Sequence, residues 1–195
     1  IVAEKAWLQA LAQRCQEVGA LLVIDEVQTG MGRTGSLFAF QQFGIEPDIF
    51  TLAKGLGNGF PVGAMFGKGE LAASFGPGSH GSTFGGNKLA MAVALAVVKT
   101  MQEPDFFPQV AQVSQQLAKG LQELKAPKLC EVRGRGLMWG LEFSDQEELL
   151  RVMAAAEAKG LLTLRAGEKV LRLLPALTIT PAEVTRGLSI LAEVL

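Results

Sequence analysis

The sequence predicts an α/β sheet domain followed by a smaller α+β region. Three short apolar stretches have the length of strands and are separated by glycine-rich turns; they lie at 20–24, 47–55 and 61–67. The C-terminal part alternates helical and strand-like patterns over short spans, which is typical of a small α+β domain. We therefore predict one domain at 1–102 and a second at 103–195.

The first predicted helix covers 4–19, where Trp7, Leu11 and Val18 recur at helical spacing and Gly19 marks the end. This helix and the strand at 20–24 form half of a β-α-β unit, and no earlier strand precedes them. The chain also opens on Ile rather than Met. We therefore expect that further residues of the same domain lie upstream.

The remaining elements follow in order along the chain. Helical spacing rich in alanine covers 87–101, and Pro104 interrupts it before an amphipathic helix that runs to about Leu124. The last third predicts two strands joined by a turn at 129–143, a helix at 145–159, strands at 161–164 and 170–174, and a closing helix from Pro181.

Composition limits the possible partners. The formal net charge is −1, and no run of Lys and Arg is long enough to follow a phosphate backbone, so we expect no nucleic acid. No apolar stretch approaches the roughly 18 residues of a membrane span, and no signal-like segment opens the chain, so we expect a cytoplasmic protein without a membrane partner. Cys15 and Cys130 lack metal-ligand spacing, and we interpret both as reduced packing residues and expect no metal site.

The stretch LLVIDEVQTG, residues 21–30, ends an apolar run with two adjacent carboxylates, Asp25 and Glu26. A buried strand that ends in this way delivers charge to the edge of a sheet. One chemistry with this pattern is the Walker B strand of P-loop NTPases, where the aspartate holds Mg²⁺. Its partner loop, G-x-x-x-x-G-K-[ST], does not occur in the chain, although upstream residues could carry it.

A second chemistry needs a lysine, and Lys54 follows the next strand. Ligands of open α/β sheets bind outside the carboxyl ends of the strands, so Asp25 and Lys54 can face one ligand. An amine in apolar surroundings favours its neutral form, which is the nucleophile that makes a Schiff base. A buried carboxylate suits the ring nitrogen of pyridoxal phosphate, which must stay protonated for the ring to accept electrons.

Three segments carry a family resemblance: DEVQTGMGRTG (25–35), PDIFTLAKGLGNGFPVGAM (47–65) and HGSTFGGN (80–87). They resemble class III pyridoxal-phosphate aminotransferases, in the subgroup that contains ornithine, acetylornithine and 4-aminobutyrate aminotransferases. The third segment and VLRLLPALTIT (170–180) are most similar to the acetylornithine members. The resemblance implies transferase fold type I, as part of the large mixed-sheet domain and a C-terminal small domain, and covers about the C-terminal half of the family's length.

The resemblance also implies roles for single residues. Lys54 stands at the family's T-x-[AS]-K-[GA] position and would bind the cofactor covalently and move the substrate proton. Asp25 would pair with the ring nitrogen, Val27 would pack on the ring face, and Gln28 would bond near its phenolic oxygen. A surface amide is the alternative for Gln28, and Glu26 would be a structural carboxylate.

Further positions come from the later motifs. Thr83 would reach the cofactor phosphate of the neighbouring subunit in a homodimer, and Ser82 would contact substrate, although both types also cap turns in glycine-rich loops. His80 is expected to be a loop hydrogen-bonding residue. Arg33 and Arg172 are candidates for binding a substrate carboxylate, with structural pairing as the default.

The function implied by the resemblance is transfer of the terminal amino group of N-acetylornithine to 2-oxoglutarate, a step of arginine biosynthesis. Ornithine, succinyl-diaminopimelate and 4-aminobutyrate are the alternative donors, and a cofactor-free scaffold or assembly module is the alternative that is not an enzyme. In the family, the phosphate-binding loop, the residue stacked on the ring and the main carboxylate-binding arginine precede this region. We therefore expect the chain to be the C-terminal part of such an enzyme.

Overall fold

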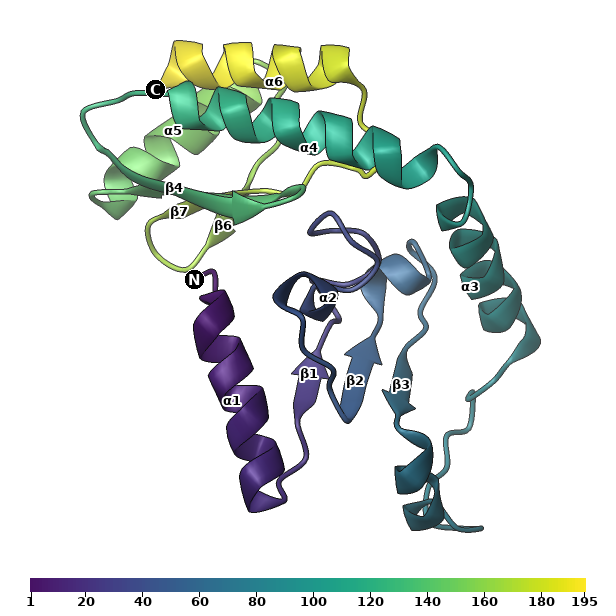
Figure 1. Ribbon diagram of the computed structural model, residues 1–195. Coiled ribbons are helices and arrows are strands. Elements are labelled where there is room, and N and C mark those ends of the chain that lie inside the picture. Colours follow the sequence, from purple (N-terminus) through teal and green to yellow (C-terminus); the bar gives the residue numbers. More distant parts are fainter. The chain divides into compact units, whose positions relative to one another are not determined.

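A computed structural model describes all residues, 1–195, and the chain divides into two compact units (Figure 1). The N-terminal unit covers Ala3–Phe106, and the C-terminal unit covers Phe107–Leu195 together with Ile1 and Val2. None of the helices is both long enough and apolar enough to cross a membrane.

The N-terminal unit holds a mixed three-stranded sheet and the helices around it. Its elements are α1 (Lys5–Val18), β1 (Val23–Asp25), α2 (Phe40–Phe43), β2 (Ile49–Leu52), η1 (Lys54–Leu56), β3 (Ala64–Gly67), η2 (Gly69–Ser74) and α3 (Lys88–Met101). The sheet order is β1-β2-β3, with β1 and β2 parallel and β3 antiparallel to β2. Helix α1 ends as predicted at Gly19, whose φ of 68° is left-handed.

Asp48 pins the register of this sheet. Its carboxylate accepts hydrogen bonds from the backbone N–H of Leu22, at 2.7 Å, and from Lys68 Nζ, at 2.8 Å. The Lys68 bond is also the main reason why the pKa of Asp48 lies below its ordinary value. Since Leu22 precedes β1 and Lys68 follows β3, the Asp48 side chain links the ends of all three strands, in a sheet whose register pairs Asp25 with Thr51.

The two faces of this sheet differ. One face carries an aromatic cluster of Phe38, Phe40, Phe50 and Phe66, with ring centroids 4.7–5.4 Å apart. On the other, more open face Val23 is 56% exposed and Met65 is 51% exposed, while Ile49 and Thr51 are half-buried. The expectation of a buried first strand is not met within these 195 residues, where β1 lies at the edge of the sheet and only Ile24 is half-buried.

The C-terminal unit is an antiparallel sheet with helices on one side (Figure 1). Its elements are α4 (Phe106–Glu123), β4 (Leu129–Arg135), β5 (Met138–Phe143), α5 (Gln146–Ala158), β6 (Leu164–Ala166), β7 (Val170–Leu173) and α6 (Pro181–Val194). The sheet order is β4-β5-β7-β6. Strand β6 begins three residues after the predicted start at residue 161, because pairing with β7 starts only where Leu164 meets Arg172.

Alternation along β5 and β7 builds the core of this unit. Trp139, Leu141 and Phe143 are buried, and the residues between them are half-buried. The helices supply the opposite layer, and Gly120 of α4 lets α6 come close, since a Cβ at that position would lie 2.9 Å from Leu188 Cδ2. Because only one face of this sheet is apolar, the three helices pack on that face and form a single layer.

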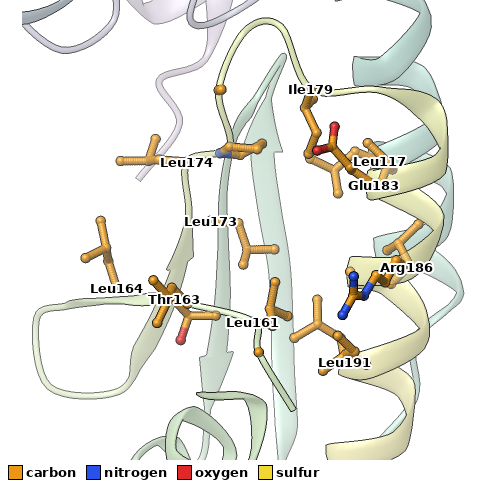
Figure 2. A pocket seen from close by; sticks show the side chains of 18 of the residues that line it. Leu117, Leu161, Thr163, Leu164, Leu173, Leu174, Ile179, Glu183, Arg186 and Leu191 are labelled. Carbon is orange, nitrogen blue, oxygen red and sulfur yellow. The ribbon is translucent and has the colours of Figure 1, made fainter. Parts of the chain in front are cut away.

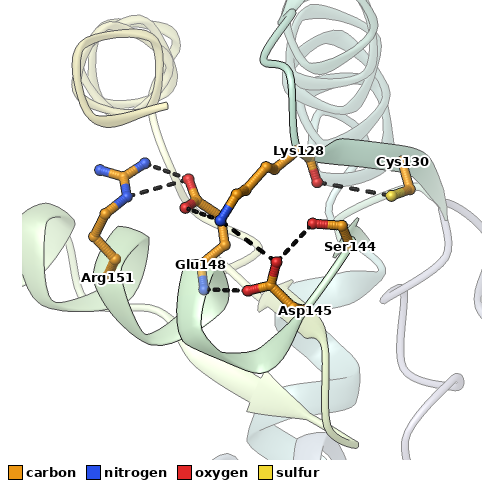
Figure 3. Close-up of polar contacts among 6 residues, drawn as sticks. All are labelled: Lys128, Cys130, Ser144, Asp145, Glu148 and Arg151. Carbon is orange, nitrogen blue, oxygen red and sulfur yellow. Dashed lines mark hydrogen bonds and ion pairs between the residues drawn. The ribbon is translucent and has the colours of Figure 1, made fainter.

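A polar cluster starts helix α5 (Figure 3). Asp145 caps the helix by accepting the backbone N–H of Glu148 at 2.8 Å, and Lys128 Nζ lies 3.4 Å from Asp145 and 3.5 Å from Glu148. Beside it, the thiol of Cys130 donates to the carbonyl of Lys128 at 3.7 Å. Both cysteines are free, but Cys130 is exposed and Cys15 only half-buried, so the prediction that they are packing residues fails for Cys130.

Candidate functional site

Asp25 ends β1 on the open face of the sheet. Its Oδ1 accepts two hydrogen bonds, from Thr51 Oγ1 at 2.7 Å and from the backbone N–H of Val27 at 3.0 Å. Its Oδ2 accepts none from the chain. The Thr51 hydroxyl, then the Val27 N–H and the positive charge of Lys54, hold the pKa of this carboxyl below its ordinary value. Asp25 is therefore an ionised acceptor with one oxygen available to a ligand.

Glu26, the neighbouring acid, has a different role. Its carboxylate is 1% exposed and accepts hydrogen bonds from Thr29 Oγ1 at 2.6 Å and from the backbone N–H of Phe40 at 2.9 Å. Successive strand residues point to opposite faces, so Glu26 turns into the unit while Asp25 turns out. The adjacent acids thus divide into one structural carboxylate, as expected, and one that is free to bind.

Lys54 follows β2 after one residue, Ala53, and opens η1. Its φ of 45° is left-handed, which is uncommon for a residue with a side chain and is found at functional sites. Its carbonyl accepts the backbone N–H groups of Gly57 and Asn58, at 3.1 and 3.0 Å. Lys54 is exposed, and its side-chain amine forms no hydrogen bond or ion pair within the chain. The turn therefore presents an unpaired amine at the edge that also carries Asp25.

The glycines beside Lys54 keep this turn compact. A Cβ on Gly57 would collide with the carbonyl oxygen of Phe60 and lie 2.6 Å from Val62 Cγ1. A Cβ on Gly55 would lie 3.0 Å from the Cβ of Met31, which is buried. The predicted role of these glycines, a tight backbone turn at the site, agrees with this packing.

The other predicted site residues lie nearby along the chain or in a separate loop. Val27 and Gln28 follow Asp25, both are half-buried, and the Gln28 amide has no hydrogen bond within the chain. Ser82 and Thr83 lie in an exposed loop that leads to α3, and neither bonds to Asp25 or Lys54. The structure therefore brings together Asp25, Lys54 and their neighbours, and leaves the Ser82 loop without a direct bond to them.

Two expectations about this site need correction. Asp25 and Lys54 were expected in a buried, apolar setting, and both are exposed, because they lie on the open face of the sheet. Thr51 received no role from the sequence. Its signal in the sequence was its place as the threonine of the T-x-[AS]-K-[GA] motif, three residues before Lys54, and only the strand register shows that it meets Asp25.

A cavity of about 580 Å³ lies elsewhere, within the C-terminal unit. Figure 2 shows Glu183 and Arg186 of α6 on one side of it and Leu161 and Leu173 on the other. Arg172 of β7 also lines it, and the Nε atom of Arg172 is buried without a hydrogen-bond partner. Because its lining is mostly apolar and Glu183 is committed to capping α6, we place the candidate site at Asp25 and Lys54 instead.

The two remaining polar candidates, His80 and Arg33, lie in a loop and in a turn. His80 makes an edge contact with the ring of Phe75, with centroids 6.4 Å apart, and lies in an exposed loop. Arg33 is half-buried in the turn that follows β1. The His80 contact does not involve Asp25, so His80 does not join the carboxylate and amine at the sheet edge.

A carboxylate with one free oxygen and an unpaired primary amine, at the carboxyl edge of a mixed sheet, match a cofactor with a protonated ring nitrogen and a reactive carbonyl. Such an arrangement is typical of α/β enzymes that bind their cofactor through a lysine. The class-III aminotransferase family matches residues 1–195, and the chain belongs to that family. This confirms the predicted resemblance and fold type I, and pyridoxal phosphate is the cofactor of the family.

Individual relatives agree with this assignment. An acetylornithine aminotransferase of Streptococcus mutans is 53% identical, over 98% of this chain and 51% of the relative. Among solved structures, N-acetylornithine aminotransferase from Stenotrophomonas maltophilia is 38% identical with a TM-score of 0.85, over 98% of this chain and 51% of that one. An ornithine aminotransferase from Toxoplasma gondii with partial PLP occupancy at its active site is 32% identical with a TM-score of 0.91, over 98% and 46%.

The coverage is also a finding. The chain spans about half the length of the curated relatives that it matches. The family match covers the whole chain. The activity of the relatives belongs to proteins about twice as long, so we treat that activity as a proposal for this chain.

Proposed function

We propose that this chain supplies the lysine-bearing part of a pyridoxal-phosphate aminotransferase that moves the terminal amino group of N-acetylornithine to 2-oxoglutarate. The single observation that carries the proposal is the edge of the β1-β2 sheet, where Asp25 keeps one carboxylate oxygen free beside the unpaired amine of Lys54. The relatives named acetylornithine aminotransferase, at 46–53% identity, support the choice of donor.

Pyridoxal phosphate, when bound, supplies a ring that withdraws electrons from the substrate carbon bearing the amino group. Lys54 Nζ would hold the cofactor covalently and would take the proton from that carbon once released. Asp25 would accept the ring N–H through its free oxygen and so keep the ring protonated. Val27 would pack against the ring, and the Gln28 amide would donate toward the ring's phenolic oxygen.

The exposed loop before α3 completes the pocket in this proposal. Thr83 donates to the cofactor phosphate of a neighbouring subunit, and Ser82 contacts the substrate. Both side chains are exposed and have no partner within the chain, which leaves them available to a second copy. A two-fold homodimer would then contain two equivalent pockets. We place this enzyme in the cytoplasm, with the small-molecule donor and 2-oxoglutarate as its other partners.

The donor is the finer part of the proposal. Ornithine remains the first alternative, because a solved ornithine aminotransferase also shares the fold at a TM-score of 0.91. Succinyl-diaminopimelate and 4-aminobutyrate follow. In the protein that carries this sequence at the length of its relatives, we expect the highest kcat/KM with acetylornithine. A preference for 4-aminobutyrate would reject the donor and keep the cofactor chemistry.

The cofactor assignment is tested on the protein that carries this sequence at the length of its relatives. Pyridoxal phosphate is added to the wild type and to Lys54→Ala, and the absorption spectrum is recorded before and after borohydride. The wild type should show a band near the visible edge that reduction abolishes, and peptide mapping should find the label on Lys54. Lys68→Ala serves as the control, because Lys68 pairs with Asp48 away from the proposed pocket. A label on any other lysine contradicts the assignment, and no band favours a cofactor-free scaffold.

A further inference from the structure

Thr51 is a hydroxyl residue in the apolar strand β2, and its side chain makes one hydrogen bond. Strands β1 and β2 are parallel and pair Asp25 with Thr51, so both side chains point to the open face of the sheet. The Thr51 hydroxyl donates to Asp25 Oδ1 at 2.7 Å. The strand register therefore aims this hydroxyl at the acid expected to bind the cofactor.

Thr51 constrains Asp25 from two sides. Its hydroxyl shares Asp25 Oδ1 with the backbone N–H of Val27, and its carbonyl accepts the backbone N–H of Glu26 at 3.0 Å. Threonine is branched at Cβ, so few rotamers are open to the hydroxyl. With both donors on Oδ1, the carboxylate is held against rotation, and Oδ2 is the oxygen that faces outward without a partner.

We propose that Thr51 is a positioning residue, which fixes the Asp25 carboxylate so that Oδ2 meets the ring nitrogen of the bound cofactor. This inference rests on the proposed function. Without the hydroxyl, Val27 is the only remaining donor to Oδ1, and the carboxylate gains freedom to turn Oδ2 away from the ring. The ring nitrogen then loses part of the bond that keeps it protonated.

The electrostatics of Asp25 support this geometry. The Thr51 hydroxyl is the largest of the causes that hold the pKa of Asp25 down, ahead of the Val27 N–H. The charge of Lys54 also lowers this pKa, but its effect is smaller than that of the two hydrogen bonds. Removing the hydroxyl should therefore move the titration of Asp25 while every nearby charge stays in place.

The first test uses the cofactor-free chain. The titration midpoint of the Asp25 carboxyl is followed by ¹³C NMR in the wild type, Thr51→Val, Thr51→Ala and Thr51→Ser. Thr100→Val is the matched control, because the Thr100 hydroxyl bonds only the carbonyl of Ala96 within α3. The midpoint should rise in the valine and alanine variants and stay near the wild type in the serine variant and the control. An unchanged midpoint in folded Thr51→Ala or Thr51→Val overturns the proposal.

The second test uses the enzyme at the length of its relatives, loaded with pyridoxal phosphate. Thr51→Val should lower kcat by about 10-fold, as expected for a lost hydrogen bond to a charged group, and Thr51→Ser should restore most of it. KM should change less than kcat. Equal kcat in Thr51→Val and the wild type overturns the proposal. If the wild type never binds the cofactor through Lys54, the proposed function fails, whereas the Asp25 midpoints still decide whether Thr51 controls that carboxyl.

Discussion

Replacing Gly57 with alanine tests whether the turn after β2 positions Lys54. Gly57 has φ −103° and ψ −7°, which alanine can adopt, so the effect is steric. The new methyl would collide with the carbonyl oxygen of Phe60 and lie 2.6 Å from Val62 Cγ1. Phe60 also donates its backbone N–H to the Gly57 carbonyl at 2.9 Å, so the obstacle belongs to the same closed turn.

The cost follows from which atoms can move. Overpacking costs about 1–3 kcal/mol, and the upper end applies because the obstacle is backbone rather than the end of a flexible side chain. For a unit of about 100 residues this lowers Tm by about 5–20 °C. A shift of about 1 Å in the turn would also reduce the rate of a positioned group by about 100-fold.

The assay is thermal unfolding of Gly57→Ala beside Gly69→Ala, a control in which a Cβ meets nothing within 4 Å. We expect a clear fall in Tm for the first variant and almost none for the second. The amount of cofactor fixed to Lys54 by borohydride is measured on both. If Gly57→Ala matches the control in Tm and in labelling, the turn is not sterically closed and the reasoning is wrong.

Three further predictions concern other parts of the molecule. Asp25→Ala should lower kcat by at least about 100-fold through loss of the ring-nitrogen partner, and weaker cofactor binding at unchanged kcat would reduce Asp25 to an anchor. Thr83→Val should weaken cofactor binding by about 1–3 kcal/mol. A mixture of Thr83→Val and Lys54→Ala should be more active than the average of the two variants, because one pocket of the mixed dimer holds both defects and the other holds neither. If the mixture shows no such excess after subunit exchange is confirmed, the cross-subunit contact of Thr83 is refuted. The backbone N–H of Glu148 is the main cause that lowers the pKa of Asp145, so the ionised carboxylate stabilises the fold at pH values above the ordinary pKa of 3.8, and this stabilisation is lost as the pH falls through the folded pKa. The Tm advantage of the wild type over Asp145→Asn should therefore narrow below about pH 4, and a Tm difference that stays constant with pH contradicts this prediction.

The sequence located most elements because their signals are local. The helices α1, α3, α5 and α6 match their predicted spans within about two residues, since spacing and end residues fix them; Asn87 and Thr180, for example, cap α3 and α6. The four-residue helix α2 was missed, because its start depends on a bond from its backbone N–H to Glu26, fourteen residues earlier. The predicted domains at 1–102 and 103–195 remain a prediction.

The candidate site divides in the same way. The family motifs identified Asp25 and Lys54, and the structure places both at the carboxyl edge of neighbouring strands. The predicted roles of Val27, Gln28 and Thr83 stay predictions. No pattern in the sequence distinguished the partners of the adjacent acids, because these partners come from other strands and turns.

The sequence by itself determined the family and the order of the elements, and it singled out the two residues of opposite charge that we propose to face one ligand. Motif spacing and end residues act over a few positions, so one chain is enough to see them. Only the tertiary structure decided that Glu26 is buried and bonded while Asp25 stays open, and that Thr51 holds one Asp25 oxygen and leaves the other free. These outcomes depend on strand register and on which face of the sheet is covered, and both are set by contacts between residues far apart in the chain.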